Sequence, residues 1–180
     1  MNTEKNFILK LLNDNSKEQA FRELIGLYKK PLYNHIRNIV LNHDDADDVL
    51  QNTFIKVFNN LKNFKGESKL YSWMYRIATN EAISHINSNA KKHNKNLTEW
   101  NEKAVDKLAS DIYFDGDEIQ LKLQKAIAKL PYKQQLVFKM KYFEELKYEE
   151  ISEILNTSVG ALKASYHLAV KKIEEYLTNN

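Results

Sequence analysis

The chain has 180 residues, 43% of them hydrophobic, and a formal net charge of +3. This composition is ordinary for a globular protein with a buried core, and the charge alone does not indicate nucleic-acid binding. Because the sequence contains no cysteine, disulfides, cysteine-based zinc sites and thiol nucleophiles are excluded. No apolar stretch resembles a signal peptide or a membrane span, so we expect a cytoplasmic protein without membrane insertion.

The pattern of apolar residues predicts helices along most of the chain. Residues 46–61 give the clearest signal, because apolar side chains recur there at the i, i+3, i+4 and i+7 spacing of one helix face. Asp44 or Asp45 is the expected N-cap, where a carboxylate also meets the positive end of the helix dipole. An earlier helix is expected to kink or restart at Pro31, and a later one covers residues 70–86.

The second half of the chain differs in composition from the first. The stretch after residue 86 is rich in Asn, Lys, Ser and His and only weakly periodic, which is typical of a linker. Four short helices are expected between Ile119 and Leu177. We therefore predict an all-α fold with two small helical domains, residues 1–88 and 118–180, joined by a flexible linker over residues 89–117.

Two of these C-terminal helices have the spacing of a helix-turn-helix. Residues 148–155 form the first helix, three polar residues form the turn, and the second helix starts at Val159. Asn156 suits the left-handed backbone that the turn needs, and Ser158 can cap the second helix. Leu162 then points back toward the first helix. The alternative is a plain hairpin of two helices within a bundle.

The exposed face of the last helix is predicted to be basic. Its side chains can reach phosphates and base edges if the helix enters the major groove of DNA. These side chains are Lys163, His167, Lys171 and Lys172. Glu174 and Glu175 would repel phosphate, so the predicted DNA face ends before them.

Aromatic and basic residues are also mixed between residues 62 and 76. Aromatic faces can stack on unpaired bases while cations hold the backbone, which is how single-stranded DNA is commonly bound. The aromatic residues are Phe64, Tyr71, Trp73 and Tyr75, and the cations are Lys62, Lys65, Lys69 and Arg76. Trp73 falls on the apolar stripe and is expected in the core. For Phe64, Tyr75 and Asn80 the residue pattern leaves both a core role and a DNA role open.

Residues 45–58 closely resemble the polymerase-binding helix of extracytoplasmic-function (ECF) sigma factors of the sigma-70 family. Residues 63–68 and 71–80 are similar to the promoter-melting loop and helix that follow in those proteins. Residues 148–172, together with an upstream Leu-Pro pair, resemble the second conserved domain of the family. The resemblance covers nearly the whole chain apart from the linker, in two motif blocks in the correct order.

The resemblance implies three sets of contact residues. Asp48, Gln51 and Asn52 would face the coiled coil of the polymerase β′ subunit. The −10 promoter element would be opened and held by Phe64, Lys65, Tyr75, Arg76 and Asn80. The −35 element would be read by Lys163, Ala164, His167, Leu168 and Lys171. The sequence departs from the family at Asn52, where Glu is usual, and at Ser165 and Leu168, where Arg is frequent.

The function implied by the resemblance is that of a transcription initiation factor, not an enzyme. Its partners would be the β′ and β subunits of core RNA polymerase, promoter DNA and, in many relatives, an anti-sigma factor, with a monomeric free state. No cofactor or metal is expected, because the histidines lack metal-ligand spacing and the Asp44–Asp48 cluster is explained by helix capping and a partner-binding face. The alternative function is a helix-turn-helix regulator that acts without being a polymerase subunit.

Overall fold

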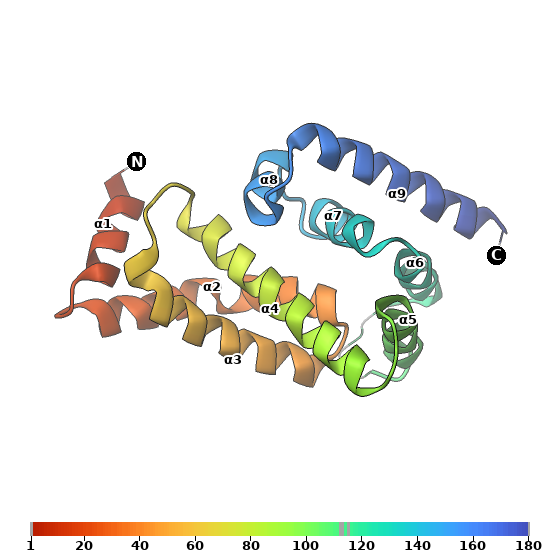
Figure 1. Ribbon diagram of the computed structural model, residues 1–180, viewed down its shortest axis with the longest axis horizontal. Coiled ribbons are helices and arrows are strands. Elements are labelled where there is room, and N and C mark those ends of the chain that lie inside the picture. The colour runs from red at the N-terminus through yellow and green to blue at the C-terminus, as the bar shows by residue number, and fades with distance from the viewer. Residues whose placement is uncertain (1, 112–113, 115, 180) are drawn as a thin grey trace.

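The computed structural model describes residues 2–111, 114 and 116–179, and all regular structure in these residues is helical (Figure 1). The helices form an N-terminal bundle, a connecting helix and a C-terminal group. The N-terminal bundle contains α1 (Asn2–Leu12), α2 (Lys17–Val40), α3 (His43–Asn60), a 3-10 turn (Leu61–Asn63) and α4 (Leu70–Lys92). α5 (Leu97–Leu108) connects it to α6 (Glu118–Ala128), α7 (Tyr132–Tyr142), α8 (Tyr148–Leu155) and α9 (Val159–Asn179).

The predicted apolar stripe of residues 46–61 forms the inner face of α3, which packs against α2 and α4. The predicted N-cap was wrong, however. Asn42 caps α3, because its side chain accepts a hydrogen bond from the backbone N–H of Asp45 at 2.9 Å. Asp44 and Asp45 instead lie in the first turn, where carboxylates still favour the positive end of the helix dipole.

α2 continues through Pro31 and does not restart there. Proline lacks a backbone N–H, so the carbonyl group of Leu27, one turn earlier, loses its helical donor. Both Pro31 and Leu27 are exposed, and water can therefore satisfy that carbonyl. α2 ends at Leu41, which adopts a left-handed conformation with φ 59° and bonds back to the Arg37 carbonyl.

The C-terminal helices follow the predicted boundaries closely. Pro131 precedes α7, and a three-residue turn joins α8 to α9. Asn156 adopts the predicted left-handed conformation, with φ 50° and ψ 49°. Ser158 caps α9, because its hydroxyl group accepts a hydrogen bond from the Ala161 N–H at 3.3 Å. Leu162 is fully buried, as its spacing from the first helix requires.

The stretch expected as a flexible linker contains a helix, α5, and in this respect the prediction was wrong. α5 buries Val105 and Leu108 against Leu41 and Ala128. Its Asn101 side chain donates a hydrogen bond to Gln135 on α7 at 3.1 Å, which ties α5 to the C-terminal helices. Residues 112, 113 and 115 of the expected linker lie outside the described residues.

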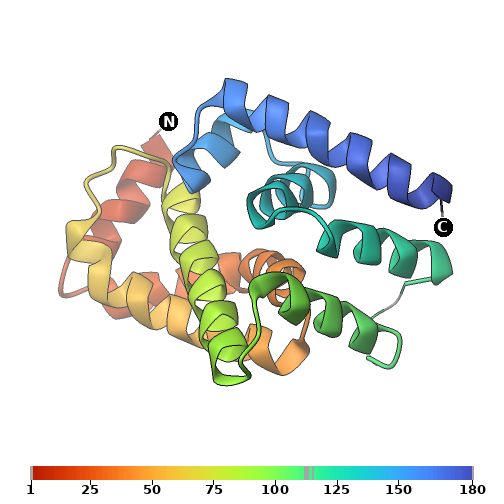
Figure 2. The same cartoon turned by 45° about the vertical axis from the view of Figure 1, so that its right-hand side comes forward.

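The two bundles share one hydrophobic core. Buried side chains of α2, α3 and α4 belong to the same cluster as buried side chains from the C-terminal half. The C-terminal members are Leu136, Val137, Met140, Leu146, Ile151, Ile154 and Leu162. Figure 2 shows the resulting arrangement, in which α8 lies beside the first half of α4. Within the described residues, no helix has the length and apolar character needed to cross a membrane.

The hydroxyl group of Tyr132 is buried beside this core without a hydrogen-bond partner among the described residues. Burial raises the pKa of this hydroxyl, and a buried hydroxyl without a partner costs free energy. We expect Tyr132→Phe to raise the free energy of unfolding by about 1 kcal/mol, measured by urea denaturation. The matched change at the exposed Tyr142, Tyr142→Phe, should leave stability unchanged. A loss of stability in Tyr132→Phe would contradict the prediction.

Candidate nucleic-acid and partner interfaces

The five residues predicted on the last helix lie together on one exposed face of α9. We call Lys163, Ala164, His167, Leu168 and Lys171 the α9 face. All five are exposed, and their i, i+1, i+4, i+5 and i+8 spacing places them on one side of the helix. Leu168 is 47% exposed although it is a large apolar residue. The structure therefore presents a basic face with an apolar centre.

α8 packs against the side of α9 that lies opposite the α9 face. Ile151 and Ile154 of α8 and Leu162 of α9 are buried together, so the angle between the two helices is set by a packed core. Lys163 lies with its ammonium group 5.7 Å from the centre of the Tyr148 ring. This contact is within the range of a cation–π interaction and leaves the lysine at the surface.

The three residues predicted on the earlier helix also lie at the surface. Asp48, Gln51 and Asn52, the α3 face, are all exposed on α3. Beside them lies an apolar groove between α2 and α3 with a volume of about 450 Å³. It is lined by Phe21, Ile25, Gln51, Phe54, Ile55, Phe58 and Asn59.

The groove does not follow from the sequence pattern. Ile55 is 58% exposed, although the apolar stripe of its helix lies on the opposite side. A single isoleucine outside an otherwise regular stripe was the available signal. Phe21 and Phe58 fall on predicted apolar stripes, and both lie at the edge of the core with ring centroids 4.9 Å apart.

The residues predicted to contact melted DNA are divided between the surface and the interior. Lys65 and Asn80 are exposed. Phe64 is only 8% exposed and packs on Trp73, with ring centroids 5.0 Å apart. Gly66 follows with φ 72°, the left-handed conformation that lets the loop turn back toward α4. In this arrangement Phe64 belongs to the core and does not offer a free stacking face.

Of the remaining two, Tyr75 is buried among side chains of α2 and α4, and Arg76 contacts α8. Tyr75 is 4% exposed and lies between the rings of Tyr71 and His35, with centroid distances of 4.1 and 4.6 Å. Burial, together with the neighbouring Tyr71, raises the pKa of the Tyr75 hydroxyl. Arg76 donates two hydrogen bonds to the backbone carbonyl of Glu153, at 3.0 Å from Nε and 2.5 Å from a terminal nitrogen.

The Arg76 contact has a local cause in α8. This helix spans Tyr148–Leu155, so the Glu153 carbonyl is one of the last four, which lack a partner within the helix. A guanidinium group at this end also meets the negative end of the helix dipole. Arg76 of the N-terminal half therefore donates to a carbonyl group of the C-terminal half that has no partner within its own helix.

A buried histidine makes a second polar contact between the two halves. His35 of α2 is fully buried, and its Nδ1 lies 2.9 and 3.0 Å from the carboxylate oxygens of Glu144, between α7 and α8. Its Nε2 lies 2.8 Å from the hydroxyl oxygen of Thr79, which donates its only hydrogen to the Tyr75 carbonyl. Nε2 then donates to the Thr79 hydroxyl, and Nδ1 lies within hydrogen-bond distance of the Glu144 carboxyl group.

Glu144 also faces a buried lysine of its own half. Lys139 is 4% exposed. Burial lowers the pKa of its ammonium group to about 8, and the nearby Glu144 carboxylate opposes this change. None of these contacts between the halves was predicted from the sequence, because each joins residues far apart in the chain.

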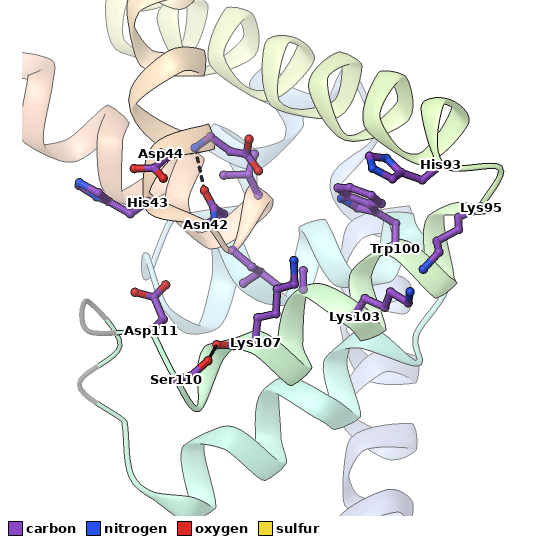
Figure 3. A pocket seen from close by; sticks show the side chains of 14 residues that line it. Asn42, His43, Asp44, His93, Lys95, Trp100, Lys103, Lys107, Ser110 and Asp111 are labelled. Carbon is purple, nitrogen blue, oxygen red and sulfur yellow. Dashed lines mark hydrogen bonds between the residues drawn. The ribbon is translucent and has the colours of Figure 1, made fainter.

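The structure gives Trp100 a position next to a surface pocket. The pocket has a volume of about 500 Å³ and lies between the start of α3, the end of α4 and α5 (Figure 3). Trp100 packs on His93 at a ring distance of 5.1 Å, while Lys95, Lys103 and Lys107 line one wall. The pKa of the Lys95 ammonium group is lowered, mainly by its hydrogen-bond contact with Lys103 and to a smaller extent by loss of hydration. Trp100 thus anchors α5 on the end of α4.

Comparison with known proteins gives two family matches in the same order as the two halves. Residues 24–92 match the family described as "Sigma-70 region 2", and residues 120–173 match "Sigma-70, region 4". The first covers α2 to α4 with the α3 face, and the second covers α6 to α9 with the α9 face. The chain therefore belongs to the sigma-70 family of RNA polymerase sigma factors.

Similar curated relatives are RNA polymerase sigma factors, and several of them are named as extracytoplasmic-function factors. "ECF RNA polymerase sigma factor SigW" of Bacillus subtilis (strain 168) is 29% identical over 168 residues, covering 89% of this chain and 90% of that protein. "RNA polymerase sigma-H factor" of Pseudomonas aeruginosa is 28% identical, covering 89% and 87%. The chain is an ECF sigma factor of the sigma-70 family.

Solved structures of similar fold include two complexes, one of which contains a sigma factor. The structure of CnrH in complex with the cytosolic domain of CnrY matches with a TM-score of 0.69 at 19% identity, over 97% of both chains. The sigma factor RpoE in complex with the anti-sigma factor NepR from Bartonella quintana matches with a TM-score of 0.65 at 19% identity, over 88% of this chain and 96% of that one. At this identity the likeness concerns the fold.

Proposed function

We propose that the chain binds core RNA polymerase through the α3 face and the adjacent groove and brings it to promoters. The observation that supports this most strongly is the α3 face itself. Three directional polar residues are exposed beside an apolar groove, and exposed Ile55 lies in that groove. A polar rim around apolar anchors is the usual composition of a protein–protein interface.

Promoter recognition is assigned to two surfaces. The α9 face would read the −35 element, because it is exposed, basic and held rigidly by α8. Of the residues expected at the −10 element, the exposed Lys65 and Asn80 would contact the DNA directly. Phe64, Tyr75 and Arg76 could join them only after leaving the contacts described above. Capturing and stacking unpaired bases offsets the cost of unstacking them. No covalent chemistry is needed for either step.

The −35 surface would depend on phosphate contacts more than on guanine readout. It carries lysines and a histidine but no arginine. Lysine is a point charge, whereas arginine can bind both acceptors of guanine at once. Leu168 occupies the centre of the α9 face and offers an apolar contact, of the kind that thymine methyl groups accept.

The proposed contact with polymerase is tested by changing the charge and the hydrogen-bonding groups of the α3 face. Asp48→Arg combined with Gln51→Ala should lower co-elution with core RNA polymerase at least 10-fold, because a wrong charge and a lost hydrogen-bonder at an interface cost about 1.4 kcal/mol or more. The matched control is Asp14→Arg with Gln19→Ala, a pair of equally exposed residues elsewhere. The measurement is size-exclusion chromatography with purified core enzyme.

The outcome also separates the proposal from the alternative regulator. Full association of the Asp48 and Gln51 variant with polymerase would show that the α3 face is not the contact. Binding of the wild-type chain to promoter DNA without any association with polymerase would favour a helix-turn-helix regulator instead.

A further inference from the structure

We infer that the pocket beside Trp100 binds a free purine nucleotide, with the base on the indole ring and the phosphate groups on Lys103 and Lys107. The pocket lies between the start of α3, the end of α4 and α5 (Figure 3). It shares no residue with the α3 face, the groove between α2 and α3 or the α9 face. The inference therefore goes beyond the proposed function and does not depend on polymerase or promoter binding.

The pocket has the size of a small-molecule site. Its volume of about 500 Å³ falls within the range of about 300–1,000 Å³ that such sites occupy. Trp100, Lys103 and Lys107 line it from one side of α5, because residues at i, i+3 and i+7 share a helix face. At a rise of about 1.5 Å per residue, Trp100 and Lys107 are about 10 Å apart along the helix axis. The ring and the charges thus follow one another in a row, as the base and the phosphates of an extended nucleotide do.

The cations of this row lack carboxylate partners. Lys103 and Lys107 are one turn apart on α5, and like charges at this spacing destabilise a helix. Lys95 adds a third positive charge, and its contact with Lys103 lowers the pKa of its ammonium group. Within the described residues none of the three lysines forms an ion pair, and the nearby Glu99 carboxylate accepts a hydrogen bond from Asn96 at 2.8 Å. A bound polyanion would offset the repulsion between these lysines.

The α3 side of the pocket is acidic and directs an anion toward α5. Asn42 caps α3, and Asp44 and Asp45 lie in its first turn, where they already supply the positive end of the helix dipole with negative charge. Asp111, which also lines the pocket, pairs with Arg37 at 2.5 Å. Carboxylates repel phosphate, so the phosphate groups of a ligand have favourable contacts only along the row of lysines.

Trp100 gives the pocket a surface for a flat ring. Its indole ring is half-buried, packs on His93 with ring centroids 5.1 Å apart and still lines the pocket. Bases stack on aromatic side chains of this kind, and a purine offers more contact area than a pyrimidine. A polyphosphate without a base would leave this surface uncovered. The pocket therefore fits a ligand that carries both a ring and phosphates.

Isothermal titration calorimetry of the full chain with ATP, GTP, tripolyphosphate and guanosine tests the inference. ATP or GTP should bind about 10-fold or more tightly than tripolyphosphate, which lacks the base, and than guanosine, which lacks the phosphates. A Trp73→Phe variant leaves Trp100 as the sole tryptophan of the chain. Its fluorescence should be quenched as the nucleotide is added, because the base stacks on the indole ring.

Two pairs of lysine substitutions separate a specific site from general electrostatics. Lys103→Gln with Lys107→Gln should weaken nucleotide binding about 10-fold or more, because two phosphate contacts are lost. The matched control is Lys91→Gln with Lys92→Gln, which removes the same charge from exposed residues at the end of α4 that do not line the pocket. This control should bind as the wild type does. Trp100→Leu should lower the affinity for nucleotide to that for tripolyphosphate, whereas Trp100→Phe should keep most of the difference.

Three outcomes would overturn the inference. Equal affinity for nucleotide and tripolyphosphate, or an equal loss in both lysine pairs, would describe a charged surface without a site for a ring. No binding at millimolar nucleotide would exclude the site altogether. A short single-stranded oligonucleotide that binds more tightly than ATP and GTP, and loses this affinity in the Lys103 and Lys107 variant, would assign the pocket to a nucleic-acid strand instead. Circular dichroism at 222 nm checks the fold, and if Trp100→Leu loses its helical signal, Trp100→Phe and the lysine pairs decide.

Discussion

Lys139→Met is expected to raise the free energy of unfolding at pH 7 by about 3 kcal/mol. Lys139 is 4% exposed, and burial lowers the pKa of its ammonium group from 10.5 to about 8. A pKa difference of one between the folded and unfolded states corresponds to about 1.4 kcal/mol, so the charged form is about 3 kcal/mol less favourable in the folded protein than in the unfolded chain. Methionine fills a similar volume without a charge.

The pH dependence of the wild type follows from the same lowered pKa. The unfolded chain keeps this proton up to pH 10.5, whereas the folded protein releases it near pH 8. Between these values the unfolded state binds more protons, so stability rises with pH through this group. The free-energy cost of burying the charged form of Lys139 is fully present below pH 8 and disappears above pH 10.5. We expect the advantage of Lys139→Met to shrink steadily from pH 8 to pH 10.

Urea denaturation at pH 7 and at pH 10 provides the measurement. The control is Lys133→Met, which removes the same charge from an exposed position on the same helix and should have nearly the stability of the wild type at each of the two pH values. A variant that is less stable than the wild type at pH 7 would mean that the attraction between Lys139 and Glu144 outweighs the cost of burial.

Lys163→Glu is expected to lower transcription from a cognate promoter by 10-fold or more. Lys163 is the first residue of the α9 face, and its exposed side chain lies over the Tyr148 ring. Replacing a phosphate or base contact by a like charge costs about 1–3 kcal/mol. The dependence of binding on salt should also weaken, because fewer counterions are released from the DNA.

Run-off transcription with purified core polymerase, at several salt concentrations, measures this effect. Lys125→Glu on α6 makes the same charge change on an exposed residue outside the α9 face, and it should retain most of the activity. Equal loss in both variants would indicate a general electrostatic effect and would remove the specific role of Lys163.

The parts of the structure that could be predicted are those set by local sequence. The basic residues of the α9 face, Lys163, His167 and Lys171, follow from helical spacing, because every third or fourth residue of a helix lies on one side. Ala164 and Leu168 were expected there from the family resemblance. The turn before it was predicted because Asn tolerates the left-handed conformation that Asn156 adopts. The exposure of Asp48 and Gln51 followed in the same way from the apolar stripe on the other side of α3.

The parts that could not be predicted depend on contacts distant in sequence. The burial of Tyr75, for example, depends on its contact with His35 of α2, 40 residues earlier in the chain. The sequence predicts a linker where α5 lies, because polar residues dominate the composition of that stretch. Its few apolar residues are enough to dock it once Leu41 and Ala128 provide the opposite surface. The local sequence pattern of a segment does not indicate which distant residues it will pack against.

The core shared by the two halves has a consequence for the turnover of this protein. Met140 and Ile151 are almost fully buried in the same cluster as Leu24 and Met74. Separating the halves in the absence of a partner would expose these apolar side chains to water, and exposed apolar patches of this kind promote aggregation and proteolysis. The amount of the chain that persists in a cell would then follow the amount of partner available to cover it. We expect unpartnered open chains to be removed first.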